Sequence, residues 1–341
     1  MGGKALNKYG VFTERKNTII YNDIKFKIIF QLNKDFKSKL KSHSVVSYHT
    51  KEDHGDLDLL IKENSDLNID YKKYIQDTFN PREINHNANV YSFDYKNFQI
   101  DFILISEDNW EIAKTYFSYD PAGNIMGKVF HKFNLSYGWK GLEYKFRNFN
   151  GKNSKNIPIS KDPRKIFEFS GYNYTGFLRG FETLEDIFKF LINNKYFSPE
   201  IFKFENLKHI DKKRNRKRVS YNVFLEYINK KNIKSRYEFH KNKDVYLKYI
   251  NMFFPEAKLL RKLEELKLED ERNKLLSAKF NGNIIMKHIP QLSGKLLGKS
   301  ISNFKENLSD NYEDFILNAD EEKIIEMFKS VNKIKLMKFN Y

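Results

Sequence analysis

The chain of 341 residues is 40% hydrophobic and 31% charged, which suffices for a sizeable core in two domains or in one large domain with an appended subdomain. No apolar run approaches the roughly 20 residues that a membrane-spanning helix needs, and residues 1–6 lack the apolar core of a signal peptide. We therefore expect no membrane span and a cytoplasmic protein, in the host cytoplasm if the chain is viral. Because the chain contains no cysteine, disulfides and thiolate ligands are excluded, and any metal must be held by carboxylates or histidines.

The charge balance is strongly basic: 61 lysine and arginine residues against 44 aspartate and glutamate residues give a net charge of +17. Such a surplus favours a polyanionic partner, with nucleic acid as the first candidate. The alternative is compositional, because a chain rich in lysine, asparagine, isoleucine, phenylalanine and tyrosine is typical of an AT-rich genome. Between the two, the charge by itself favours nucleic-acid binding.

Hydrophobic periodicity predicts a mixture of helices and strands over the first half of the chain. The predicted helices cover residues 21–41, 71–79, 109–117 and 127–133. The predicted strands cover residues 44–49, 57–61, 90–93, 98–105, 142–149 and 156–159, and two of them, 90–93 and 98–105, form a hairpin.

From Asp162-Pro163 onward the pattern is helical, because the aspartate can cap a helix whose first residue is proline. Thr183 with Asp186 three residues later is a near-match to a capping box. Further helices are predicted over residues 184–193, 221–230, 245–254, 257–279 and, as a pair, 309–329. We therefore expect an α+β protein with domains at residues 1–160 and 161–341.

The most informative segment contains two aspartates, Asp56 and Asp58, at the start of a predicted strand. Alternate residues of a strand share a face, so the two carboxylates point the same way while the leucines between and after them pack inward. Two like charges about 4 Å apart repel by about 4 kcal/mol at an effective dielectric near 20. A divalent cation would offset that repulsion, and Gly55 lets a ligand approach the backbone.

A third carboxylate, Asp101, lies in the otherwise apolar strand 98–105. An unpaired carboxylate in such a strand is costly to bury. If Asp101 lies beside Asp56 and Asp58, the three make an oxygen-ligand site suited to Mg²⁺ or Mn²⁺. Such a site is typical of two-metal phosphoryl transfer.

Gly55-Asp56-Leu57-Asp58, followed by an apolar strand and by Asp101, resembles the signature of the DNA-polymerase-beta-like nucleotidyltransferase superfamily, which includes poly(A) polymerases, CCA-adding enzymes and family X DNA polymerases. The resemblance covers roughly residues 20–150. It implies a palm, a mixed β-sheet flanked by helices, followed by a mostly helical C-terminal domain. It further implies that Asp56 and Asp58 are paired metal ligands, that Asp101 is the third catalytic carboxylate, and that an NTP is a substrate.

Other segments carry two narrower resemblances. Residues 1–6, 55–58, 123–127 and 137–138 are similar to a group of phage nucleotidyltransferases. Residues 280–286 and 292–300 resemble the C-terminal helical region of bacterial tRNA nucleotidyltransferases and poly(A) polymerases, where a similar glycine-rich step lies in the RNA-binding body.

The triphosphate-binding residues depart from the superfamily pattern. The Gly-Ser or Gly-Gly pair that usually precedes the acidic pair is missing from residues 45–50. Ser47 or Thr50 serves in part, or the backbone amides of Gly2-Gly3 hold phosphate oxygens; the alternative for that glycine pair is a disordered terminus.

Two basic segments are candidates for holding substrate. Lys128 and Lys132 follow a helix start predicted at Asn124 or Gly127, where they could meet a phosphate; the alternative is a packed helix with solvated lysines. The densest positive cluster would neutralise nucleic-acid phosphates, unless it is a solvated loop. The cluster consists of Lys212, Lys213, Arg214, Arg216, Lys217 and Arg218.

Together these signals predict a template-independent nucleotidyltransferase that adds nucleotides from NTPs to the 3′ end of a nucleic acid, with RNA, such as tRNA, as the favoured acceptor. Two alternatives stay open. The same core could transfer a nucleotide to a protein or small molecule, or the chain could be a non-catalytic basic RNA-binding protein with the same fold.

Overall fold

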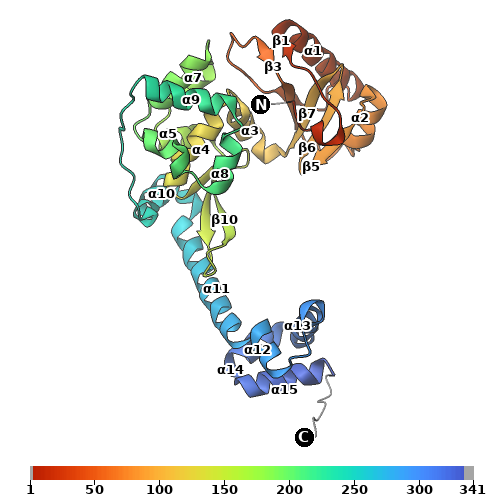
Figure 1. Cartoon of the computed structure of the whole chain (residues 1–341), viewed down its shortest axis with the longest axis vertical. Coiled ribbons are helices and arrows are strands. Elements are labelled where there is room, and N and C mark those ends of the chain that lie inside the picture. The colour runs from red at the N-terminus through yellow and green to blue at the C-terminus, as the bar shows by residue number, and fades with distance from the viewer. Residues whose placement is uncertain (1–2, 334–341) are drawn as a thin grey trace. The chain divides into compact units, whose positions relative to one another are not determined.

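The computed structural model describes residues 3–333, apart from the side chains of residues 153 and 154 (Figure 1). Its contacts divide the chain into two compact units. The first comprises the residues up to Lys145 together with Asn156–Leu259, and the second comprises Phe146–Lys155 and the residues from Leu260 onward.

A mixed five-stranded sheet lies in the first unit. The order of its strands is β2 (Ser42–Ser44), β4 (Asp56–Lys62), β7 (Phe98–Ile105), β6 (Val90–Tyr95) and β5 (Ile84–Asn87). Strands β4 and β7 run parallel, and the other neighbours run antiparallel. The parallel register places Asp58 directly opposite Asp101.

Helices α1 (Thr18–Asp35) and α2 (Tyr71–Phe79) pack on one face of this sheet (Figure 1). Every second residue of β4, namely Leu57, Leu59 and Ile61, is fully buried against them. This alternation is the period-2 pattern of a strand with one face on the core. It directs Asp56 and Asp58 to the opposite face.

The opposite face is apolar at one end of the central strands and acidic at the other. Leu60 and Ile103 pack with residues of α3 (Trp110–Phe117), which covers the apolar end. Asp56, Asp58 and Asp101 precede these residues on the same strands and so lie toward the acidic end. The sheet thus presents its carboxylates beside, rather than inside, the apolar core.

The remaining elements up to Ala257 are short helices and strands as far as β10, and helices only after it. In chain order they are η1 (Asn7–Tyr9), β1 (Lys16–Asn17), β3 (Asp53–His54), η2 (Glu107–Asn109), α4 (Ala122–Lys132), β8 (Leu135–Gly138), β9 (Gly141–Arg147), β10 (Asn153–Ser160), α5 (Pro163–Ser170), α6 (Tyr174–Arg179), α7 (Leu184–Ile192), η3 (Pro199–Phe202), η4 (Phe204–Asn206), α8 (His209–Asn215), α9 (Val219–Lys230), η5 (Lys243–Tyr246), α10 (Leu247–Phe253) and η6 (Pro255–Ala257). Strands β8, β9 and β10 form a three-stranded sheet, and β1 pairs with β3.

The C-terminal helices have a hydrophobic core of their own, which includes Phe280, Phe304 and Phe328. The helices are α11 (Leu259–Lys279), α12 (Gly282–His288), α13 (Gly294–Leu308), η7 (Ser309–Asn311), α14 (Tyr312–Asn318) and α15 (Glu321–Val331). Among the described residues, no helix is both long and apolar enough to cross a membrane.

The predicted α+β class, with a mixed sheet, flanking helices and a helical C-terminal region, is confirmed. The change to helices occurs where expected, since β10 ends at Ser160 and each described element after it is helical. The contact-based units have other limits than residue 160, so domains at 1–160 and 161–341 stay a prediction.

Several predicted elements have different limits in the structure, among them the helix predicted at residues 21–41 and the strand predicted at residues 44–49. The helix predicted at residues 21–41 begins at Thr18, because the Asn17 side chain caps it, and ends at Asp35, before Lys37 and Ser38 adopt positive φ. The strand predicted at residues 44–49 is shorter and ends at Ser44. Beyond it the backbone of Val46 bonds to Tyr119 and that of His49 bonds to Phe181, so this segment leaves the sheet.

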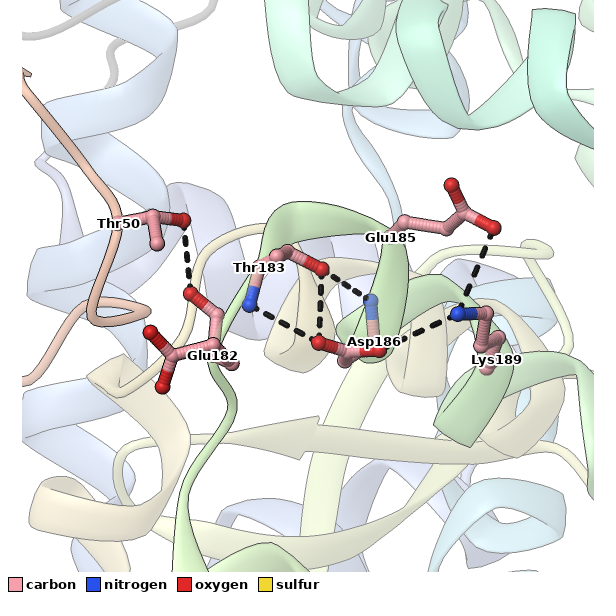
Figure 2. Close-up of polar contacts among 6 residues, drawn as sticks. All are labelled: Thr50, Glu182, Thr183, Glu185, Asp186 and Lys189. Atoms are coloured by element: carbon pink, nitrogen blue, oxygen red, sulfur yellow. Dashed lines mark hydrogen bonds and ion pairs between the residues drawn. The ribbon is translucent and has the colours of Figure 1, made fainter.

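The predicted cap of α7 is confirmed as a full capping box (Figure 2). Thr183 Oγ1 accepts a hydrogen bond from the Asp186 backbone at 3.1 Å, and the Asp186 carboxylate accepts one from the Thr183 backbone at 3.0 Å. The preceding residue, Glu182, accepts a hydrogen bond from Thr50 Oγ1 at 2.8 Å through its carbonyl oxygen. The box therefore fixes the start of a helix that anchors the loop leading to the acidic strand.

Thr183→Ala should lower the free energy of unfolding by about 1 kcal/mol, because the Asp186 backbone N–H loses the hydroxyl oxygen that accepts its hydrogen bond. Urea denaturation followed by circular dichroism measures this change. Thr183→Ser, which keeps the hydroxyl, is the matched control and should stay within about 0.5 kcal/mol of the wild type. Equal stability of Thr183→Ala and the wild type would contradict the capping role.

Candidate metal centre

The three aspartates predicted as metal ligands converge in the structure. Asp56 and Asp58 lie on β4 and Asp101 lies on β7, and each offers a carboxylate oxygen within 4.8 Å of the others. Their convergence follows from the parallel register, because side chains directly opposite each other in a sheet share a face. The sequence could place Asp56 beside Asp58, but only the pairing of β4 with β7 adds Asp101.

The carboxylates disfavour one another's ionisation. The pKa of Asp58 is raised well above its ordinary value, by burial first and then by the charges of Asp56 and Asp101. Burial and the Asp56 charge raise the pKa of Asp101 to about 7, and burial also raises the pKa of Asp56. All three side chains keep some exposure, so the site is densely surrounded by protein yet open to a ligand.

Neighbouring groups compensate this charge only in part. Within residues 3–333, no lysine or arginine forms an ion pair with any of the three carboxylates. Lys51 lies close enough to oppose the rise in the pKa of Asp56 and Asp58, and its Nζ donates to Ser47 Oγ at 3.3 Å. Three converging carboxylate oxygens without a paired cation match the donor set of a hard divalent ion. The residues therefore fit a metal ion.

The residues before the acidic pair have structural partners. His54 is buried, its ring stacks on Tyr21 with centroids 3.8 Å apart, and it lies 3.2 Å from Thr18 Oγ1. Burial, with the charge of Lys51, lowers the pKa of His54 to about 4, so its ring is neutral at pH 7. Gly55, also buried, follows it at the start of β4. His54 and Tyr21 thus support the strand from the side of α1.

The predicted nucleotide-binding residues belong to separate segments, except that Lys128 and Lys132 share helix α4. Ser47 lies in the loop before β3 and is held by Lys51. Helix α4 begins at Ala122, earlier than predicted, so Lys128 lies in its middle and Lys132 in its last turn. Lys128 is buried and forms an ion pair with Asp211 at 3.0 Å, so its ammonium group already has a partner. Nucleotide contacts of Gly55, Ser47, Lys128 and Lys132 stay predictions.

The predicted nucleic-acid-binding cluster lies on α8 and the residues after it. Lys213, Arg214, Arg216 and Lys217 are exposed, and Lys212 and Arg218 are partly exposed. Helix α8 is attached to α4, because Asn215 Oδ1 accepts a hydrogen bond from the Asn124 side chain at 3.0 Å. This cluster therefore remains available for phosphates, unlike Lys128.

Three residues at the centre have contacts that the sequence did not predict, although Gly3 was named above as a possible holder of phosphate oxygens. Gln99 Nε2 donates to both oxygens of Asp101, at 2.9 and 3.1 Å, and the Gly3 backbone amide donates to Asp56 Oδ2 at 3.0 Å. The third is Lys51. Strand periodicity could have identified Gln99, since it lies two residues before Asp101 on the same face. No local signal predicts the contact of Gly3 with Asp56, because the two residues are 53 positions apart.

A scan of the sequence against protein-family models gave no match, and a search among curated proteins gave no significant match either. The chemistry of the centre is accordingly inferred from its geometry.

Asp58→Asn should abolish stabilisation by Mn²⁺, because it removes the central carboxylate of the three. A ligand at 100 times its Kd stabilises the folded state by about 2.7 kcal/mol. In urea denaturation, we expect the free energy of unfolding of the wild type to be higher by this amount with Mn²⁺ than with EDTA. We expect no such difference for Asp58→Asn. Asp66→Asn, at an exposed aspartate after β4, is the control and should respond as the wild type does.

The metal-free protein should lose stability as the pH rises from about 4 to about 7. The pKa of Asp101 is about 7 in the folded protein against 3.8 ordinarily, so the folded state holds the proton more tightly than the unfolded state. The corresponding stability is complete below the lower value and is lost as the pH approaches the higher one. Asp101→Asn should therefore show a smaller decline in urea denaturation with EDTA across this range. Parallel declines in the two proteins would contradict the raised pKa.

Proposed function

We propose that the protein is a metal-dependent nucleotidyltransferase that adds nucleotides from NTPs to the 3′ end of a nucleic acid, with RNA as the acceptor and Mg²⁺ or Mn²⁺ as the cofactor. The observation that supports it is the convergence of Asp56, Asp58 and Asp101 on one face of the sheet, with oxygens within 4.8 Å of one another. Such sites hold two divalent ions in enzymes that transfer phosphoryl groups.

In the proposed reaction, the 3′ hydroxyl oxygen of the acceptor attacks the α-phosphorus of the NTP. The new bond forms as the bond from the α-phosphorus to the bridging oxygen breaks, and pyrophosphate leaves. Asp56 and Asp58 would hold the divalent cofactor. Asp101 orients the acceptor side and takes the hydroxyl proton directly or through water. Bound divalent cations would lower the pKa of the hydroxyl and stabilise the charge on the pyrophosphate.

Two further features support a nucleic-acid acceptor over a protein or small molecule. The net charge of +17 favours a polyanion, and the cluster at residues 212–218 exposes four basic side chains. The segment after this cluster is connected to the neighbourhood of the acids. Ser220 Oγ donates to Asp120 Oδ2 at 2.6 Å, and the charge of Asp120 raises the pKa of Asp58. We infer that a nucleic-acid strand bound along residues 212–218 extends to the acidic face of the sheet.

Asp58→Ala should reduce NTP incorporation by about 1,000-fold without unfolding the protein. The variant lacks a ligand of the divalent cations that would stabilise charge on the attacking and leaving oxygens. The assay uses each of the four radiolabelled NTPs with Mg²⁺ or Mn²⁺ and a 3′-hydroxyl RNA, and circular dichroism confirms the fold. Asp66→Ala, at the exposed aspartate after β4, is the matched control and should retain wild-type incorporation.

Parallel reactions contain DNA, protein and small-molecule acceptors. If label is transferred only to protein or to a small molecule, the proposed nucleic-acid acceptor is wrong and that molecule is the acceptor. If calorimetry shows RNA binding but no metal-dependent NTP binding, the protein is an RNA-binding protein and not a nucleotidyltransferase. Undiminished incorporation by folded Asp58→Ala would remove the proposed mechanism.

A further inference from the structure

The N-terminal segment, residues 3–14, lies against the acidic end of the sheet. The Gly3 amide donates to Asp56 Oδ2 at 3.0 Å, and the Ala5 amide donates to Gln99 Oε1 at 2.8 Å. Gln99 in turn donates through Nε2 to both oxygens of Asp101. Two amides of one short segment therefore reach two of the three carboxylates, one directly and one through a buried glutamine.

The oxygen and the nitrogen of the Gln99 side-chain amide have different partners. Its oxygen accepts from the segment and its nitrogen donates to Asp101, and its side chain is only 2% exposed. Loss of the Ala5 amide would leave a buried acceptor without its partner, which favours rotation of the side chain. The orientation of the Asp101 carboxylate therefore depends on a residue at the beginning of the chain.

Position 3 accepts only glycine in this geometry. Its φ of +80° lies in the left-handed region, and a Cβ atom there would lie 2.2 Å from the Gly55 carbonyl oxygen. The segment thus lies too close to the backbone immediately before Asp56 for any side chain at position 3. A side chain at this position would move the Gly3 amide away from the carboxylate.

The segment is held by further contacts of the residues that follow. Leu6 is 1% exposed, Thr13 Oγ1 donates to the Gly3 carbonyl oxygen at 3.0 Å, and the Glu14 amide donates to the Asn97 carbonyl oxygen at 2.9 Å. Lys4, between the two amide donors, is exposed. The backbone of this stretch faces the site while its charged side chain faces solvent.

We propose that Gly3 and Ala5 are positioning residues of the metal centre: the Gly3 amide fixes the Asp56 carboxylate, and the Ala5 amide, through Gln99, fixes Asp101. Groups that orient metal-binding carboxylates typically change metal affinity 10- to 100-fold when they are removed. The inference rests on the metal-dependent part of the proposed function and goes beyond it, because it assigns a role to a segment outside the acidic motif.

The test measures Mn²⁺ binding to the full-length protein by electron paramagnetic resonance and by calorimetry, with no nucleotide present. Gly3→Ala and a variant lacking residues 2–5 should each bind Mn²⁺ about 10-fold more weakly than the wild type and give a broadened spectrum. Lys4→Ala is the matched control, because it changes the same segment without altering either amide, and it should bind as the wild type does. Urea denaturation of each variant establishes that the fold persists, and if Gly3→Ala folds poorly, the deletion variant decides.

Unchanged Mn²⁺ affinity and spectrum in the two folded variants would overturn the inference. Tighter binding would also overturn it, since it would mean that the segment competes with the ion for Asp56. Wild-type protein that binds no Mn²⁺ removes the metal centre and this inference together. Wild-type protein that binds Mn²⁺ but incorporates no NTP contradicts only the proposed function, and the affinities of the variants still decide the role of Gly3 and Ala5.

Discussion

The mutual repulsion of Asp56, Asp58 and Asp101 is the constraint around which the N-terminal sheet is organised. Burial raises the pKa of all three carboxylates, neighbouring acidic charges raise the pKa of Asp58 and Asp101 further, and no described lysine or arginine pairs with them. The sheet tolerates this because its other face is packed against α1 and α2, so the strands cannot separate to relieve the charge. A bound divalent cation would turn the same geometry from a destabilising feature into a stabilising one.

The surroundings of the acids hold them by hydrogen bonds rather than by ion pairs. Backbone and amide donors, from Gly3 to Asp56 and from Gln99 to Asp101, restrict the carboxylates without cancelling their charge. A paired arginine would have stabilised the metal-free protein but would have competed with a cation. Lys51 lies near the pair but bonds to Ser47, so it affects the site through its field alone. This combination suits a site that must stay open to an ion.

Much of the sheet could be predicted from the sequence because its signals are local. The alternation of apolar and acidic residues in β4, the hairpin of β6 and β7, and the capping residues Asp162 and Thr183 each depend on neighbours in the chain. Predictions about the lysines of α4 were less informative. Helical spacing cannot distinguish an exposed Lys128 from one buried against Asp211, since that aspartate comes from a helix 83 positions later (211 − 128). Residues 46–49 look like a strand, but Val46 and His49 have backbone partners outside the sheet, Tyr119 and Phe181.

The sequence by itself determined that two carboxylates share a face, because the period of a strand depends only on the chain's own stereochemistry. It also determined the α+β class, the chain's strong positive charge and a metal chemistry restricted to oxygen and nitrogen ligands. The tertiary structure decided that Asp101 joins the pair, because the register of two parallel strands depends on how both pack against the rest of the fold. It likewise decided that Gly3 contacts Asp56 and that Ala5 contacts Gln99, because contacts between residues so far apart leave no periodic trace in the chain.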